Sequence, residues 1–133
     1  MKQHPHDTPD VLRVGHLLAD AARLATLPYF RTAALSADNK LAGGYDPVTE
    51  ADRAAERAMR EILSKERPDD AILGEEYGSA SGQSGLTWVL DPIDGTRGFV
   101  SGTPTWGVLI ALSDDNGPFF GIIDQPYIGE RFI

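Results

Sequence analysis

Residues 88–99 read WVLDPIDGTRGF, an apolar run that leads directly into two aspartates. The run predicts a β-strand that ends at Asp91, because Pro92 keeps the residue before it out of helical geometry. Asp94 follows after one turn-forming interval, so the two carboxylates could converge on one point. Carboxylates that close repel each other unless a cation lies between them, and Mg²⁺ prefers oxygen ligands, including backbone carbonyls such as that of Ile93. Asp-Pro and Asp-Gly are also ordinary turn pairs, and the spacing alone favours a simple turn.

Polar residues close to this stretch could complete such a site. Gly95 permits a phosphate to approach backbone N–H groups, and a helical turn that follows at Thr96 would point its donors at the anion. Glu75 closes another short apolar strand, and from a neighbouring position in the same sheet it would reach the same end. Glu75 and Glu76 are equally well explained as a solvated loop, and Asp52 as a helix-capping residue.

Apolar periodicity predicts helices in the first half of the chain. The first helix is predicted by an apolar stripe, with a start signal at Thr8-Pro9 and a stop at Pro28; the stripe consists of Val11, Val14, Leu18, Ala21 and Ala25. A capping-box pattern at residues 49–52 predicts the start of a second helix, and Pro68 closes it. Its apolar stripe consists of Ala51, Ala55, Ala58, Met59, Ile62 and Leu63.

The second half predicts strands at residues 71–73, 87–90, 106–112 and 119–123, with a further strand at 129–133. Residues 114–117 read DDNG and predict the turn of a hairpin. Residues 79–85 are expected to be a loop, and residues 36–45 a loop or a short edge strand. Two helices followed by strands predict an α+β domain with both helices packed on one face of a mostly antiparallel sheet.

Size and composition limit the functional classes. The 133 residues suffice for one domain, expected over residues 9–133, after a polar tail at residues 1–8 in which His4 and His6 face solvent. A net charge of −8 argues against non-specific binding to nucleic acid or to a membrane surface. The absence of cysteine excludes disulfides and thiolate zinc sites. Without an apolar targeting or spanning segment, a cytoplasmic protein is expected.

Taken together, four segments resemble the inositol monophosphatase family of magnesium-dependent, lithium-sensitive phosphatases. They are DPVTEAD at 46–52, GEE at 74–76, WVLDPIDGT at 88–96 and GERF at 129–132, in the order in which the family has them. The resemblance implies the N-terminal half of the layered αβαβα sandwich that the family shares with fructose-1,6-bisphosphatases. It also makes a metal site far more plausible than a simple turn.

The resemblance implies a role for each matching residue. Glu75, Asp91 and the carbonyl of Ile93 would hold a first metal ion, and Asp91 would bridge to a second ion shared with Asp94. Two or three Mg²⁺ ions are implied, for which Mn²⁺ could substitute. The remaining implied roles are phosphate binding by Asp94 and the N–H groups of Gly95 and Thr96, activation of the attacking water by Asp52, Thr96 and Glu75, and support of the metal ligands by Glu76. Lys40 matches a family lysine only loosely.

The segment DPIDGTRGFVSGTPTWGVLIAL resembles the histidinol-phosphatase branch, which makes L-histidinol phosphate the leading substrate. Arg97 would contact substrate or a neighbouring subunit, and a surface ion pair explains it equally well. Inositol-1-monophosphatase, or another small-molecule phosphatase of the family, is the alternative function. A regulatory interaction domain is a third possibility, since family members bind other proteins.

Family members continue into a second α/β domain that carries a further aspartate ligand and most substrate-selecting residues. The sequence ends at Ile133, so the resemblance implies either a fragment or a chain completed by a partner. A truncated metal-binding module with little activity is therefore a further alternative. Uncovered strand edges and apolar surface favour a homodimer or other self-association.

Overall fold

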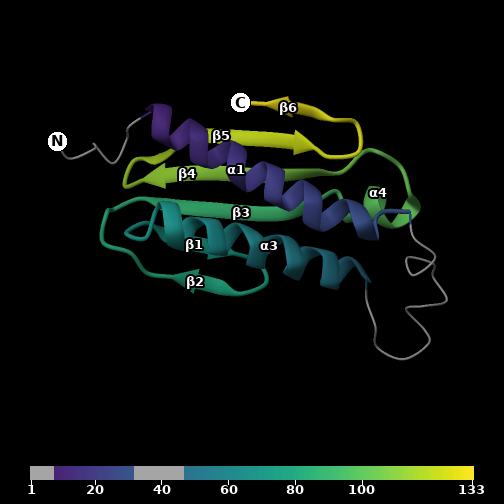
Figure 1. Cartoon of the computed structure of the whole chain (residues 1–133), viewed down its shortest axis with the longest axis horizontal. Coiled ribbons are helices and arrows are strands. Elements are labelled where there is room, and N and C mark those ends of the chain that lie inside the picture. Colours follow the sequence, from purple (N-terminus) through teal and green to yellow (C-terminus); the bar gives the residue numbers. More distant parts are fainter. Residues whose placement is uncertain (1–7, 32–46) are drawn as a thin grey trace.

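A six-stranded sheet with two long helices on one face makes up the protein, in a computed structural model that describes residues 8–31 and 47–133 (Figure 1). The helices are α1 (Thr8–Thr26), the 3₁₀ turn η1 (Leu27–Tyr29), α3 (Pro47–Glu66) and α4 (Thr96–Ser101). The strands are β1 (Ala71–Gly74), β2 (Gly78–Ala80), β3 (Thr87–Asp94), β4 (Gly107–Asp114), β5 (Gly117–Gln125) and β6 (Glu130–Phe132). The predicted α+β class is confirmed.

The sheet order is β2-β1-β3-β4-β5-β6, and every neighbouring pair is antiparallel except β1 with β3, which is parallel. Helix α1 packs over β4 and β5, and α3 over β3 (Figure 1). No helix in the described part of the chain is long and apolar enough to cross a bilayer. The predictions for His4, His6, Lys40 and residues 36–45 concern residues outside the described ranges.

Helix α1 approaches the sheet closely because it carries a glycine on its buried face. A Cβ at Gly15 would lie 2.8 Å from atoms of Ile122 and Phe120, so any larger residue would push the helix outward. The predicted stripe is confirmed at Val11, Val14 and Leu18, whereas Ala21 and Ala25 are only half-buried. The buried face instead turns through Gly15, Ala19, Ala22 and Thr26.

Helix α3 begins at Pro47, two residues before Thr49, so the predicted capping box at residues 49–52 is wrong. A proline at the first helical position has the required φ and loses no hydrogen bond there. Asp52 consequently lies in the second turn, half-buried, and its interpretation as a capping residue is not supported. The predicted end is confirmed, because the helix stops at Glu66 ahead of Pro68.

Three predictions in the second half need correction. Residues 79–80 lie in edge strand β2 rather than in a loop, because a hairpin at the end of β1 pairs them with Leu73 and Ile72. Strand β3 does not end at Asp91 but continues to Asp94. Helix is not confined to the first half, since α4 follows Gly95, although the helical turn expected at that point is confirmed. The β4–β5 hairpin and strand β6 are confirmed.

Two apolar clusters hold these elements together. The larger one lies between the helices and the sheet and centres on Trp88, Leu18 and Met59. The smaller one consists of Phe30, Ala51, Ile93, Phe99 and Trp106. Within it the rings of Phe99 and Trp106 meet edge-on at 4.8 Å between centroids, a favourable aromatic geometry. The smaller cluster fixes α4 against the end of β3, where the predicted phosphate-binding residues lie.

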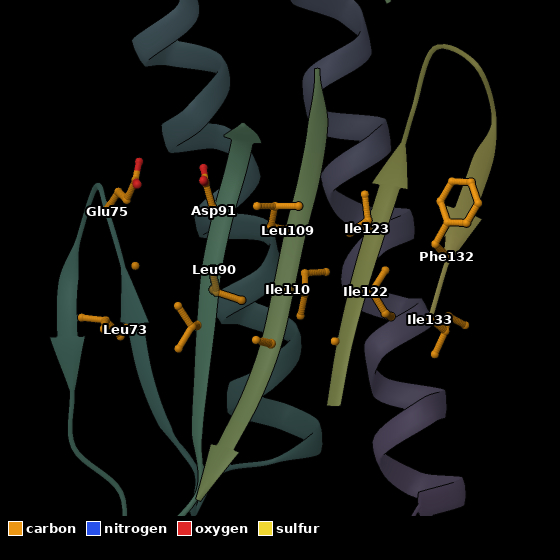
Figure 2. Close-up of a pocket in the computed structure, with 14 residues that line it drawn as sticks. Leu73, Glu75, Leu90, Asp91, Leu109, Ile110, Ile122, Ile123, Phe132 and Ile133 are labelled. Atoms are coloured by element: carbon orange, nitrogen blue, oxygen red, sulfur yellow. The ribbon is translucent and has the colours of Figure 1, made fainter. Parts of the chain in front are cut away.

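The sheet face opposite the helices is open. A groove of about 930 Å³ runs across it, with a mainly apolar lining that includes Leu73, Val89, Leu109, Ala111, Ile123 and Phe132 (Figure 2). Glu75 and Asp91 also line this groove, and Figure 2 shows both at the same end of their strands. The predicted acidic residues therefore border an apolar surface rather than open solvent alone.

Candidate metal centre

Parallel pairing of β1 with β3 brings Glu75 and Asp91 together. Gly74 is the register partner of Leu90, so the next residues along the two strands, Glu75 and Asp91, come to neighbouring positions. Figure 2 shows their carboxylates at the same end of the two strands. The sequence prediction that Glu75 reaches the end of the strand that carries Asp91 is confirmed by this register.

A β-bulge follows Asp91 within β3. Asp91 pairs with Leu109 and Asp94 with Gly107, so three steps along β3 oppose two steps along β4. Bulges re-aim side chains and are common next to active sites. Here Pro92 and Ile93 are buried while Asp94 is exposed, which frees the Asp94 carboxylate to lie beside Asp91. The bulge allows both aspartates of the DPID segment to serve one site.

The ionised form of the Asp91 carboxyl is electrostatically unfavourable in the chain without a bound cation. Burial raises the pKa of its carboxyl to about 6, the negative charges of Glu75 and Asp94 add to the increase, and a hydrogen bond from the backbone of Ile93 opposes it. The Oδ1 atom of Asp91 is buried and has no hydrogen-bond partner among the described residues. A buried carboxylate oxygen without a partner costs free energy, which a bound cation would remove.

Asp52 faces the same group of acids from helix α3. The pKa of its carboxyl is raised to about 7, mainly by burial. The negative charges of Glu76, Asp91, Glu75 and Glu56 add to the increase, in decreasing order. The charges that act on Asp52 are thus those of the acids at the ends of β1 and β3 and of Glu56 on its own helix. A carboxyl group with a pKa near neutrality is suited to exchange protons at physiological pH.

The residues predicted to bind phosphate lie at the start of α4. Gly95 has φ 87°, in the left-handed region that favours glycine, and precedes the helix as its N-terminal cap. A Cβ at Gly95 would lie 2.8 Å from the carbonyl oxygen of Thr105, so no side chain fits there without displacing that loop. Thr96 and Arg97 are both exposed in the first turn of α4. Gly95 and Thr96, whose N–H groups are the predicted phosphate donors, are thus exposed residues at the start of a helix.

Sequence reasoning missed Glu56, a fully buried carboxylate on α3. It accepts hydrogen bonds from the backbone N–H groups of Glu76 and Tyr77, directly after Glu75. One sequence signal was present: Glu56 lies one helical turn after Asp52 and between the buried residues Ala55 and Met59. Glu76 itself is paired with Arg53 at 3.7 Å, near the rim of the site.

The donor set fits a hard divalent cation, since it consists of carboxylate oxygens and one backbone carbonyl. Within residues 8–31 and 47–133, however, no three acidic or histidine side chains are already arranged as a metal-ligand group. This is consistent with charge repulsion between Glu75, Asp91 and Asp94, which raises the pKa of Asp91. The structure thus brings Glu75 and Asp91 to neighbouring positions on β1 and β3, with Asp94 three residues further along β3.

Comparison with known proteins agrees with this arrangement. The model of the inositol monophosphatase family matches residues 8–133. Histidinol-phosphatase from Streptomyces coelicolor is 44% identical over 130 residues, which are 95% of this chain and 48% of the relative. Histidinol-phosphatase from Mycobacterium tuberculosis is 42% identical over 123 residues, 92% of this chain and 46% of the relative.

A solved inositol monophosphatase from Zymomonas mobilis is similar in structure as well. It has a TM-score of 0.78 and 49% identity, and the match covers 92% of this chain and 46% of that one. The chain thus spans about half the length of the curated relatives it matches. A family match over nearly the whole chain, together with relatives above two-fifths identity, establishes that this protein belongs to the inositol monophosphatase family.

Proposed function

We propose that this protein is a magnesium-dependent phosphate monoester hydrolase that acts on L-histidinol phosphate. One observation carries the proposal: Asp91 is half-buried next to other acids, and its buried Oδ1 atom lacks a partner among the described residues. Such an arrangement is unfavourable without a cation and becomes favourable with one. The ligands would be Glu75, Asp91, Asp94 and the carbonyl of Ile93.

Bound Mg²⁺ ions would neutralise phosphoryl oxygens and lower the pKa of a water molecule. The chain's own residues would supply orientation and proton transfer. Asp52 would accept the proton of the attacking water, and the hydroxyl group of Thr96 would orient that water. The backbone N–H groups of Gly95 and Thr96 would bind the phosphate. Glu76 would support the ligands from the rim.

The similarity to two histidinol-phosphatases supports L-histidinol phosphate as the substrate. The similarity to an inositol monophosphatase keeps inositol 1-phosphate as the alternative. A metal-binding module with little turnover is the third candidate, because the chain spans about half of its curated relatives. The proposed substrate is a small phosphorylated metabolite in the cytoplasm, and the net charge of −8 disfavours nucleic acid and membrane surfaces as partners.

Phosphate release from L-histidinol phosphate, measured with and without Mg²⁺, tests the proposal. The Asp94→Asn variant should lose at least about tenfold in rate, because even partners of metal ligands contribute about 10–100-fold. Asp115→Asn is the matched control, since Asp115 is exposed in the β4–β5 turn, away from the acids. Equal rates in wild type and Asp94→Asn would contradict the proposal. Faster release from inositol 1-phosphate would favour the alternative substrate, and metal binding without release would favour the module.

A further inference from the structure

A buried carboxylate on α3 holds the turn that carries Glu75. Glu56 has no exposed surface. Its Oε1 accepts a hydrogen bond from the backbone N–H of Glu76 at 3.0 Å, and its Oε2 accepts one from the backbone N–H of Tyr77 at 2.9 Å. Oε2 also accepts a hydrogen bond from Nε of Arg60 at 3.0 Å. Both carboxylate oxygens are thus committed to the backbone immediately after Glu75.

Gly74, the strand residue before Glu75, packs directly against the carboxylate of Glu56. A Cβ at Gly74 would lie 2.4 Å from Cδ of Glu56, so only glycine leaves room for the carboxylate beneath β1. Arg60 adds a second attachment, because it donates to the carbonyl of Gly78 as well as to Glu56. The turn between β1 and β2 is consequently fastened to α3 by hydrogen bonds at the three residues that follow Glu75.

General stability is a poor explanation for this arrangement. A buried ion pair is often no more stabilising than well-packed apolar residues of similar volume, so the core does not require a charge at position 56. What the carboxylate supplies is direction, since two backbone donors on consecutive residues fix the orientation of the peptide units that follow Glu75. Asp52 lies one helical turn earlier, so α3 both contributes an acid to the group and anchors the turn that carries another.

We propose that Glu56 is a positioning residue that fixes Glu75 beside Asp91 for cation binding. This rests on the proposed function, because Glu75 and Asp91 are its metal ligands. In this role Glu56 is neither a metal ligand nor a substrate-binding residue; it acts through the backbone of Glu76 and Tyr77. Loss of its two acceptors leaves Glu75 free to turn away from Asp91.

The Glu56→Gln variant tests this with little change in volume. A glutamine offers one acceptor oxygen, and its NH₂ group would face an N–H donor of Glu76 or Tyr77. We expect the dissociation constant for Mn²⁺, measured by calorimetry on the full chain, to rise about 10–100-fold. We also expect faster hydrogen exchange at the amides of Glu76 and Tyr77. Gly74→Ala displaces the same carboxylate from the opposite side and should reproduce both changes.

Leu63→Ala is the matched control for a purely structural effect. Leu63 is buried on the same helix, and its loss lowers the melting temperature through a cavity. Under conditions where each variant is folded, Leu63→Ala should bind Mn²⁺ as tightly as wild type. An equal loss of Mn²⁺ affinity in Leu63→Ala and Glu56→Gln would overturn the positioning role, because stability alone would then explain the effect.

The two proposals fail in different ways. A wild-type chain that binds no Mn²⁺ contradicts the proposed function, and protected Glu76 and Tyr77 amides in that sample would still support anchoring by Glu56. Wild-type Mn²⁺ binding with unchanged affinity in Glu56→Gln overturns the inference alone. Rapid exchange of both amides in the wild-type chain overturns it as well, whether or not any variant folds.

Discussion

The acidic residues Asp91 and Asp52, near the ends of β1 and β3, destabilise the metal-free chain. Asp91 and Asp52 are half-buried near other carboxylates, and burial together with these charges raises their pKa values to about 6 and about 7, so their ionised forms are unfavourable. In an unfolded chain both groups would have pKa values near 3.8. The residues proposed to serve a cation therefore oppose folding when no cation is bound.

Stability of the metal-free chain should fall as the pH rises. The folded state holds the extra protons, so the contribution of both acids is complete below their unfolded pKa of 3.8 and is lost as the pH passes about 6 for Asp91 and about 7 for Asp52. Thermal melts in a chelating buffer should show this decrease, which solvent screening of the two half-buried carboxyl groups limits to about 2 kcal/mol in unfolding free energy. Asp52→Asn should flatten the profile, whereas Asp115→Asn should leave it unchanged. A wild-type profile that rises with pH over this interval would contradict the assignment.

Among the acidic residues, the sequence predicted those that lie within a recognisable motif and missed Glu56, which lies outside any motif. Glu75, Asp91 and Asp94 could be identified because two short motifs contain them, and the register of β1 with β3 confirms that Glu75 and Asp91 are neighbours. Glu56 could not, because its function depends on which backbone amides lie above α3. That contact is formed by the tertiary fold and has no local signal beyond a charge within an apolar stripe.

Among the elements, the junction between β3 and α4 positions the site. The bulge after Asp91 and the left-handed Gly95 together turn the chain from strand into helix within a few residues. Packing of Phe99 and Trp106 then fixes α4 in place. The chemistry at this junction depends on backbone geometry as much as on the acidic side chains.

Gly95→Ala should destabilise the protein more than Gly85→Ala. Both glycines have nearly the same φ, 87° and 84°, so a side chain costs about 1–2 kcal/mol of backbone strain at either position. Only at Gly95 does the added Cβ meet a backbone atom, the Thr105 carbonyl oxygen, at 2.8 Å; at Gly85 the space is open. Urea unfolding should show an additional loss of about 1–3 kcal/mol for Gly95→Ala. Equal losses would indicate that the Thr105 loop yields freely.

Element predictions succeeded where periodicity was long and failed where tertiary contacts decide. The two long helices and the β4–β5 hairpin follow from apolar stripes and from an Asn-Gly turn. Strand β2 is exposed along its whole length, so no apolar pattern marks it, and pairing with β1 alone makes it a strand. Helix α4 has only six residues, too few for a periodic signal. The start of α3 was misplaced because Pro47 initiates the helix before the apparent capping box.

Over the whole molecule, a buried charge network joins the first helix to the last two strands. Asp124 on β5 has no exposed surface and pairs with Arg23 of α1 at 2.6 Å and with Arg131 of β6 at 2.8 Å. Arg131 also donates to Asp20 at 2.7 Å. This network attaches β6, an edge strand of three residues, to the body of the protein.

Arg131→Met should therefore weaken the whole fold. Removing one partner of a buried carboxylate costs at least about 1.5 kcal/mol, the lower range for a hydrogen bond to a charged group. Lys65→Met is the control, because the pair of Lys65 with Glu61 is exposed on both sides and should contribute less than about 1 kcal/mol. Urea unfolding compares the two variants. A loss in Arg131→Met no larger than in Lys65→Met would mean that Arg23 alone satisfies Asp124.

The open face of the sheet is where the predicted self-association would occur, with a second copy as the occupant. Ile123 and Phe132 are 49% and 55% exposed there, in a groove with a mainly apolar lining. Ile123→Lys should shift the chain toward monomer in sedimentation experiments, since a buried lysine would oppose association. Leu24→Lys is the control: Leu24 is 77% exposed on α1, outside the groove. A wild-type chain that stays monomeric at high concentration would contradict the prediction.

The central claim is that Glu75, Asp91 and Asp94 gather a divalent cation at the shared end of β1 and β3. Crystals of the chain soaked in MnCl₂ and measured at an anomalous wavelength test it most directly. The account predicts an anomalous peak in contact with the carboxylates of Glu75 and Asp91, and with Oδ1 of Asp91, the atom left without a partner among the described residues. Anomalous density absent from this edge of the sheet at saturating Mn²⁺, with the carboxylates pointing apart, would contradict it.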